Sequence, residues 1–387
     1  MGERSEDEAA KARPDLGAER PEGNSAEPLA ARILAAAREC GFDACAIASA
    51  RSRPDPEPLL AWISRGDHAG MAYMARDPLA RCDPERVLKG VRSVVCVARA
   101  YGSRMPAPEA PDSGGRWRQR SEEAAEEGVP GGSHARDGNG PAGAVRIARF
   151  AQGPDYHIVV RAGLQALLGR IGEWLPGVRA RIAVDSSLVL ERHWAAAAGL
   201  GWIGRNGCLV VPGIGSWLVL GELFLDTELP AGSPLPSGCG DCRRCHEACP
   251  HGALSDPSRL DARRCIAYWT VEHRGPFPDS RPRLDPWLFG CDLCQEACPW
   301  NGPGRGSGAI GANRGGAAAP PAARRDAHSD GGSGFPGAFP SGIDSWLAMD
   351  RAGCEARVAG TALSRAGFDG LVRNARAIRS DRARGPG

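Results

Sequence analysis

CGDCRRCHEACP at residues 239–250 and CDLCQEACPW at residues 291–300, with the single Cys265 between them, decide the fold of this region. Together they hold eight of the chain's fourteen cysteines. A 4Fe-4S cluster needs thiolates two or three residues apart on a tight backbone whose amide groups point at the sulfides. Each run is closed by a Cys-Pro pair, whose proline fixes φ at the turn that leaves the cluster. The spacing therefore predicts two 4Fe-4S clusters and a protein that handles electrons.

The two runs are expected to exchange ligands. In the bacterial two-cluster pattern, the fourth cysteine of a run serves the other cluster, because the chain crosses between the two centres as a helix. We therefore assign the first cluster to Cys239, Cys242, Cys245 and Cys298. We assign the second cluster to Cys249, Cys265, Cys291 and Cys294.

Zinc, disulfides and chance account for these cysteines less well. Zinc also uses CxxC pairs, but a four-coordinate site seldom takes three cysteines from one CxxCxxC run closed by Cys-Pro. A disulfide framework requires an oxidising compartment, and nothing in the sequence indicates export. The probability that two such runs occur by chance is negligible. The remaining cysteines stand among apolar or mixed residues, which favours small buried side chains over ligands: Cys40, Cys45, Cys82, Cys96, Cys208 and Cys354.

Length and charge limit the class of protein. A chain of 387 residues is long enough for about two to three domains. Its formal net charge of +2 argues against a protein that coats DNA, but is compatible with a local basic patch for a structured nucleic acid. Residues 1–28 carry neither an apolar signal segment nor a twin-arginine motif, and no apolar run approaches the roughly eighteen residues of a membrane helix. We therefore expect a cytoplasmic protein.

The chain before the cysteines predicts an α/β layered domain. Periodicity and punctuation indicate helices at 29–40, 59–66, 155–175 and 188–198, and strands at 42–48, 93–101, 178–185, 208–212 and 216–226. The long helix has an apolar stripe of Ile158, Leu167, Leu168, Ile171 and Trp174. Asp155 stands at its N-cap position, so Asp155-Tyr156-His157 is interpreted as a helix start in preference to a catalytic pair.

The order of the motifs resembles one family, the epoxyqueuosine reductases, which reduce the epoxide of epoxyqueuosine at the tRNA wobble base to give queuosine. Besides the cysteine runs, the resemblance is carried by VDSSLVLERHWAAAAGLGWIGRNGCLV at 184–210, SWLVLGELFLDTELP at 216–230 and DARRCIAYWTVEHRGPFP at 261–278. GMAYMARDPLARCDPERVLKGVRSVVCVARAY at 70–101 and GPDYHIVVR at 153–161 are also similar. The likeness covers about residues 29–101 and 143–301.

This resemblance implies an α+β or α/β fold in which a nitroreductase-like cobalamin-binding domain precedes a ferredoxin-like domain with two 4Fe-4S clusters. The expected cobalamin-binding and catalytic domain spans 29–228, with a flexible insertion at 102–144, and the 4Fe-4S domain spans 229–301. A disordered N-terminus is expected at 1–28 and a disordered linker at 302–343, because their composition buries little apolar surface. Residues 344–387 are interpreted as a truncated helical-repeat remnant, which would weaken tRNA binding if such repeats hold tRNA.

Specific residues carry the expected chemistry. By resemblance, Asp185 is the proton donor to the opening epoxide, and burial beside an apolar corrin would keep its carboxyl protonated. From sequence alone, an N-cap of the helix near Leu188 explains Asp185 about equally well. The resemblance places cobalamin contacts at Arg81, Asp185, Asn206, Gly207, Cys208, Leu209, Leu220 and Ala267. A solvated charge is the alternative for Arg81, and core packing is the alternative for Leu220 and Ala267.

We therefore expect an oxidoreductase of queuosine biosynthesis that takes electrons from an external low-potential donor, uses two 4Fe-4S clusters and cobalamin, and acts as a monomer away from membranes. Its partner would be the anticodon loop of tRNA carrying epoxyqueuosine, with phosphate contacts among Arg263, Arg264, Arg274 and Arg281. Two alternatives stay open, a corrinoid reductive dehalogenase and a ferredoxin-type electron carrier or activator. The sequence identifies neither the physiological donor, nor the cobalt axial ligand, nor the role of the 102–144 insertion.

Overall fold

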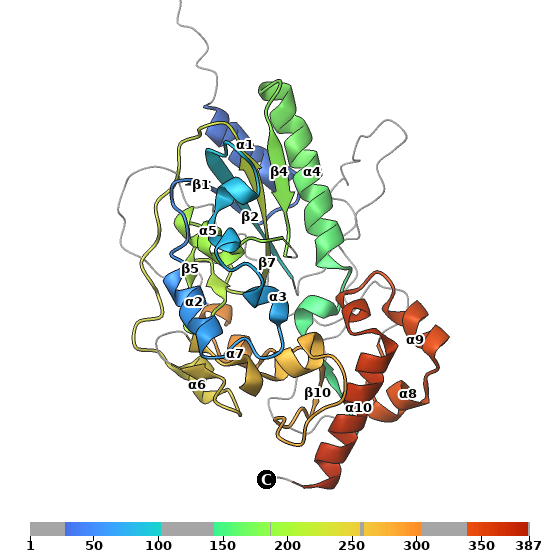
Figure 1. Cartoon of the computed structure of the whole chain (residues 1–387). Helices are drawn as coiled ribbons and strands as arrows, with labels where there is room; N and C mark the ends of the chain where they lie inside the picture. Colours follow the sequence, from blue (N-terminus) through green and yellow to red (C-terminus); the bar gives the residue numbers. More distant parts are fainter. Residues whose placement is uncertain (1–27, 102–142, 186, 256–258, 303–338, 386–387) are drawn as a thin grey trace, which may run out of the picture.

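The computed structural model describes residues 28–101, 143–185, 187–255, 259–302 and 339–385 (Figure 1). The expected disordered segments fall almost wholly outside these ranges. A four-stranded sheet in the N-terminal half has the order β1-β2-β7-β4. Its strands are β1 (Ala44–Ser49), β2 (Ser93–Ala100), β4 (Ala180–Ala183) and β7 (Leu218–Leu225). Every neighbouring pair in it is antiparallel.

Helices cover both faces of this sheet. On one face lie α1 (Leu29–Glu39) and α4 (Tyr156–Trp174), whose apolar residues pack against Val95, Val97 and Leu223. On the other face lies α5 (Glu191–Ala197), whose Trp194 packs with Phe224. Gly221 allows the close approach of α4, because a Cβ there would lie 2.6 Å from Val160 and 2.9 Å from Leu164. The alternation of buried side chains on β7 therefore builds two cores, and the mixed fold expected from the sequence is confirmed.

The long helix α4 begins where the sequence predicts it. The Asp155 side chain accepts a hydrogen bond from the His157 backbone N–H at 3.0 Å, which caps the helix. The buried stripe differs from the predicted one, because Ile158 is 58 % exposed while Val159, Val160 and Leu164 are buried. Ile158 lies on the same helix face as the exposed Arg161 and Gln165, so the prediction that it lies in the core was wrong.

Short elements connect this layer to the cysteines. A small hairpin joins β5 (Trp202–Ile203) to β6 (Leu209–Val210), so the predicted strand at 208–212 pairs outside the main sheet. Both cysteine runs enter helical turns, α6 (Arg244–Glu247) and α7 (Leu293–Glu296). The remaining short elements are α2 (Glu57–Ser64), α3 (Ala72–Ala75), η1 (Ala80–Cys82), η2 (Pro84–Arg86), β3 (Arg146–Ile147), η3 (Arg149–Ala151), β8 (Leu254–Ser255), β9 (Arg259–Leu260), η4 (Ala262–Arg264), the π-helical η5 (Tyr268–Glu272), β10 (Trp287–Phe289) and η6 (Pro299–Asn301).

The C-terminal helices pack against the cysteine-containing part of the chain. They are α8 (Ile343–Ala348), α9 (Arg351–Val358), η7 (Ala362–Arg365) and α10 (Gly367–Ala383), drawn in red in Figure 1. Trp346, Leu371 and Ile378 share one apolar core with Trp287 and Phe289. β3 joins the same unit, because it pairs in parallel with β10. Residues 143–151 therefore pack with the ferredoxin-like part, although the sequence suggested that they belong to the preceding domain.

Polar contacts fasten the C-terminal unit further. Asp381 is buried and receives both Arg281 guanidinium nitrogens, at 2.9 and 3.0 Å. The buried Asn374 amide donates to the carbonyls of Thr270 and Leu288, each at 2.9 Å. Residues 339–385 are thus an integral part of this fold. In the part of the chain that is described, no helix has both the length and the apolar character to cross a bilayer.

Candidate active site and cluster module

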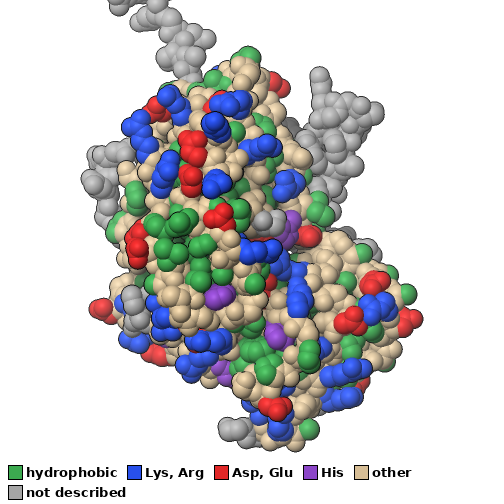
Figure 2. All heavy atoms as spheres, viewed as in Figure 1, with side chains coloured by type: hydrophobic (Ala, Val, Ile, Leu, Met, Phe, Trp, Pro, Cys, Tyr) green, Lys and Arg blue, Asp and Glu red, His purple; other side chains and the backbone are tan. Residues whose placement is uncertain are grey.

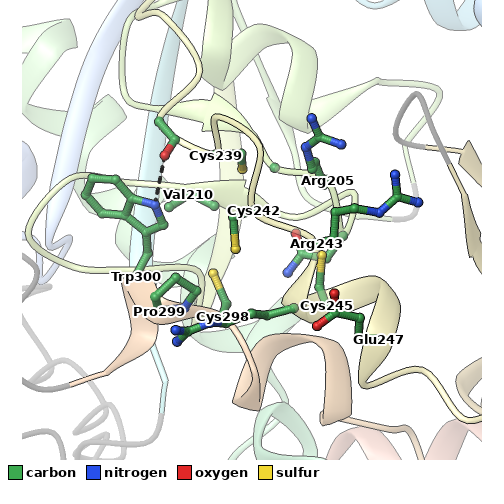
Figure 3. A pocket seen from close by; sticks show the side chains of 14 residues that line it. Arg205, Val210, Cys239, Cys242, Arg243, Cys245, Glu247, Cys298, Pro299 and Trp300 are labelled. Carbon is green, nitrogen blue, oxygen red and sulfur yellow. Dashed lines mark hydrogen bonds between the residues drawn. The ribbon is translucent and has the colours of Figure 1, made fainter.

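Cys239, Cys242, Cys245 and Cys298 line one cavity of about 740 Å³. Figure 3 shows their sulfur atoms turned toward the same space, with Trp300 and Pro299 on one side. The Trp300 indole N–H donates to the Gly238 carbonyl at 3.3 Å, which ties η6 to the first cysteine run. The structure therefore brings together the four residues that the sequence assigned to the first cluster.

The other four cysteines, Cys249, Cys265, Cys291 and Cys294, are linked by their effects on one another's pKa values. Burial raises the pKa of Cys291 to about 12, and Cys265 and Cys249 add to this rise. The pKa of Cys294 is raised by burial and by several thiols, among them Cys291 and Cys265. The Cys249 sulfur accepts a hydrogen bond from the Ala253 N–H at 3.2 Å, a contact that also suits a thiolate ligand. These contacts are compatible with the assignment of Cys249, Cys265, Cys291 and Cys294 to the second cluster, which stays a prediction.

Asp185 leaves β4 with its backbone in the left-handed region, at φ 46°. Aspartate tolerates this conformation better than most residues. Its Oδ2 lies 2.8 Å from Nε2 of His157, whose Nδ1 lies 2.7 Å from Oδ1 of Asp155. The Asp185 N–H donates to the Glu191 carboxylate in the first turn of α5. Asp155, His157 and Asp185 therefore form a carboxylate–imidazole–carboxylate relay that ends on a half-exposed carboxylate.

The electrostatics of the relay decide which of its groups holds the proton. The hydrogen bond from His157 lowers the pKa of Asp185, although burial acts in the opposite direction. The pKa of His157 is raised, chiefly by that bond and also by Asp155. These shifts favour a proton on His157 and a carboxylate at Asp185 in this structure. The expectation of a protonated Asp185 refers to the site with a corrin beside it and stays a prediction. The relay carries its proton on the imidazole and presents it through Asp185.

Two residues of this site were missed from the sequence. His157 was interpreted as part of a helix start, which is correct but incomplete, because its ring bridges two carboxylates. The ring of Tyr156 stacks on His157 with centroids 4.1 Å apart. Arg365 reaches the same place from η7, with Nη1 4.0 Å from Oδ2 of Asp185. A polar triplet directly after an N-cap is a signal for His157, whereas nothing local in the sequence marks Arg365.

The residues expected to contact cobalamin contain polar atoms that lack partners. Among the described side chains, Nε of Arg81 and Nδ2 of Asn206 are buried without a hydrogen-bond partner. The side-chain oxygen Oδ1 of Asn206 accepts a hydrogen bond from the Cys208 N–H at 3.1 Å, which directs the side-chain NH₂ away from the turn. Such orphan donors are costly unless a ligand satisfies them. Leu188, three residues after Asp185 in the chain, is an apolar side chain that is 45 % exposed. These features fit a large apolar cofactor with polar amides at its rim.

The other expected cobalamin contacts lie in different surroundings. Asn206 also lines the first cysteine cavity. Gly207 sits at φ 77°, a conformation that favours glycine. Burial raises the pKa of Cys208 to about 11, and the nearby Cys298 and Cys245 add to this rise. Leu209 and Leu220 are buried in the core beside α5, whereas Ala267 directly precedes η5 and is partly exposed.

Two of the predicted phosphate contacts take part in ion pairs within the fold. The Arg281 side chain is 8 % exposed and pairs with Asp381, so it is not available to a phosphate. Arg263 pairs with Asp261 and with the buried Asp67, but half of its side chain stays exposed.

Comparison with known proteins agrees with this geometry. Residues 238–301 match a family model described as a 4Fe-4S double cluster binding domain. Residues 81–186 match one described as epoxyqueuosine reductase QueG, DUF1730. Epoxyqueuosine reductase from Xanthomonas campestris pv. campestris is 40 % identical over 273 residues, 70 % of each chain. Epoxyqueuosine reductase from Gloeobacter violaceus is 40 % identical over 280 residues, 71 % of this chain and 76 % of the relative.

Solved structures show the same fold. Epoxyqueuosine reductase from Streptococcus thermophilus superposes with a TM-score of 0.67 at 23 % identity, over 91 % of this chain and 80 % of that one. An epoxyqueuosine reductase crystallised with an epoxyqueuosine-modified tRNA-Tyr stem loop gives a TM-score of 0.68 at 24 % identity, with the same coverage of both chains.

The fold and the paired cysteine sets define an oxidoreductase with two 4Fe-4S clusters. The chain belongs to the epoxyqueuosine reductase family. The two clusters and the cobalamin expected from the sequence are the cofactors of that family, and the orphan donors of Arg81 and Asn206 are compatible with the second of them.

Proposed function

We propose that the protein reduces epoxyqueuosine to queuosine at the wobble position of tRNA and that Asp185 delivers the proton. One observation carries this assignment. The Asp185 carboxylate is half-exposed and backed by an imidazole whose second nitrogen is held by Asp155. A carboxylate arranged in this way can pass a proton outward and be recharged from behind.

The stoichiometry of the reaction explains why a relay is useful. Removal of the epoxide oxygen as water consumes two electrons and two protons. Asp185 is placed to protonate the oxygen as the C–O bond breaks, and His157 supplies the proton that Asp185 passes on. Asp155 keeps Nδ1 of His157 protonated and fixes the orientation of the ring. A positioned acid of this kind contributes about 10²- to 10⁴-fold to the rate.

The electrons would arrive through the cysteine module. In this proposal the cysteine set that begins with Cys239 holds the first cluster, and the set that begins with Cys249 holds the second. Arg81 and Asn206 would donate hydrogen bonds to cobalamin. When bound, cobalamin supplies a low-potential cobalt centre, and protein 4Fe-4S clusters reach about −700 mV, low enough to reduce it. Glu272 ends the η5 turn that follows Cys265 and contacts Arg365 beside Asp185, so the acid and the cluster module meet there.

The substrate would be offered by an anticodon loop with its wobble base turned outward. The relative crystallised with a modified tRNA stem loop motivates this proposal. Figure 2 shows basic side chains next to a histidine where the upper, sheet-containing part meets the C-terminal helices, a surface suited to phosphates. An external low-potential donor, a monomeric chain and a cytoplasmic location, where tRNA is modified, complete the proposal.

The test is anaerobic turnover of tRNA carrying epoxyqueuosine by cluster- and cobalamin-loaded protein with a low-potential reductant. Asp185→Asn is expected to retain both cofactors and to lose most turnover. Asp279→Asn, at an exposed aspartate of the cluster module, is the matched control and should match the unaltered protein. Full activity of Asp185→Asn would refute the acid role, and absence of turnover by the loaded, unaltered protein would refute the proposed reaction.

A further inference from the structure

We infer that Arg365 is a positioning residue for Asp185 and that it makes the C-terminal helical unit part of the active site. This inference rests on the proposed function for its meaning in catalysis. The relevant segment is residues 359–365, which connects α9 to α10. It touches the Asp155–His157–Asp185 relay at both ends, at Asp155 and at Asp185.

The first contact is made by backbone atoms. The Asp155 N–H donates to the Gly360 carbonyl at 2.7 Å, immediately before Asp155 caps α4. Gly360 has a φ of 70°, which L side chains rarely adopt, so the carbonyl direction depends on glycine. The next residue, Thr361, is buried and donates its hydroxyl to the Val358 carbonyl at 2.7 Å. The segment is therefore fixed by its own bonds where it meets the relay.

The second contact is made by the Arg365 side chain. Its Nη2 donates to Oε2 of Glu272 at 2.9 Å, and Tyr73 adds a weaker bond to the same oxygen at 3.4 Å. This anchor leaves Nη1 facing Asp185, 4.0 Å from the oxygen that also contacts His157. The guanidinium thus approaches Asp185 because Glu272 holds it, and Glu272 belongs to the cluster module.

The position of this cation has a consequence for the relay. A positive charge near Asp185 stabilises the carboxylate that remains after the proton has left, and it opposes a proton on His157. The arginine would therefore favour transfer toward the substrate and restrain recapture. Among the described residues, seven side chains with titratable or charged groups surround Asp185 or its partners: Tyr73 on α3, Asp155, Tyr156 and His157 at the start of α4, Glu191 on α5, Glu272 on η5 and Arg365 on η7.

An ordinary surface ion pair between Arg365 and Glu272 is the alternative role. Exposed pairs of this kind contribute little to stability. The two roles differ in what happens to His157. A pair that only holds the fold together leaves the His157 titration unchanged, whereas a positioning residue shifts it.

The experiment follows the imidazole of His157 by NMR in cluster-loaded protein without substrate, with the resonance assigned from His157→Gln. Arg365→Ala is expected to move the titration of His157 to higher pH, because a neighbouring cation has been removed. Arg365→Lys, which keeps the charge, should return it toward the unaltered protein. Arg351→Ala removes an exposed arginine of the same helical unit and should change nothing.

Turnover gives the second readout. Arg365→Ala should lose up to about fivefold in kcat, the range that an exposed ion pair can supply, and the basic limb of its pH profile should move to higher pH. Unchanged titration and an unchanged pH profile in Arg365→Ala would overturn the inference. The NMR result does not depend on turnover, so it stays decisive if the proposed reaction fails. In that case Arg365 would still be assigned to Asp185, without an epoxide as the proton acceptor.

Discussion

Nε2 of His157 lies 2.8 Å from Oδ2 of Asp185, although the two residues belong to different elements of the fold. One stands in the first turn of α4 and the other follows β4, which lies beside β7 at the edge of the sheet. The packing of α4 on this sheet brings them together. The relay therefore depends on the tertiary fold, and substitutions of His157 and of Asp185 should have different effects.

His157→Gln removes the proton-carrying group and leaves Asp185 in place. We expect a smaller loss of turnover than for Asp185→Asn, because water can still return a proton to the Asp185 carboxylate, although more slowly than His157 does. The raised pKa of His157 keeps the relay charged up to a higher pH, and activity should fall as pH rises through that value. In His157→Gln this basic limb should disappear from the kcat profile. A variant that keeps the same limb would assign it to another group.

The cross-ligation of the clusters can be tested with pairs of substitutions. Cys242 and Cys298 line the same cavity, so the double variant C242A/C298A should lose one cluster and retain about half the iron. C249A/C298A removes one ligand from each set and should lose nearly all of it. Loss of nearly all iron from both double variants would show that the ligands of each cluster come from one run.

Glu222 provides a test of buried charge. It lies in the middle of β7 with 0 % exposure, and neither carboxylate oxygen has a hydrogen-bond partner among the described residues. Burial, with a smaller effect from Glu191, raises its pKa well above the usual range. The unfolded chain releases this proton near pH 4.3 while the folded chain keeps it, so Glu222 costs more stability as pH rises.

Glu222→Gln removes that cost. The melting temperature of the variant relative to the unaltered protein should therefore be higher at pH 8 than at pH 5.5. A melting-temperature difference between variant and unaltered protein that is the same at pH 5.5 and pH 8 would mean that Glu222 is not protonated in the folded state.

Asp67 shows the reverse dependence. Its buried carboxylate receives Arg259, Arg65 and Arg263, and these bonds lower its pKa to about 2. The stabilisation is complete above the unfolded pKa near 3.9 and is lost as pH falls toward about 2. Asp67→Asn should cost about 1–3 kcal/mol in unfolding free energy, as expected for charge-assisted bonds. The loss should be constant from pH 8 to pH 5.5, with Asp279→Asn as control, and a loss that changes over this range would contradict the assignment.

Much of the site was predictable because its chemistry is local in the sequence. Several ligands of a 4Fe-4S cluster arrive two or three residues apart in the chain, so the run CGDCRRCHEACP could be recognised without a fold. The helix cap at Asp155 and the end of β4 near Asp185 were also predicted from neighbouring residues. Contacts that depend on packing were not predictable. Nothing near Arg365 indicates that it reaches Asp185, about 180 residues away in the chain.

Burial was also harder to predict than periodicity. Ile158 fits an apolar stripe, but it lies on the same helix face as the exposed Arg161 and Gln165, so its side chain is exposed. The protonation of Asp185 was predicted from a general rule about burial, whereas a specific hydrogen bond from His157 has the larger effect.

The central claim is that eight cysteines hold two iron-sulfur clusters that deliver electrons to the site of Asp185. Metal analysis of protein purified and reconstituted without oxygen tests it most directly, together with the EPR spectrum of the reduced protein. The account predicts about eight irons per chain and signals of reduced 4Fe-4S clusters. Zinc in place of iron, with no such signal, would contradict it.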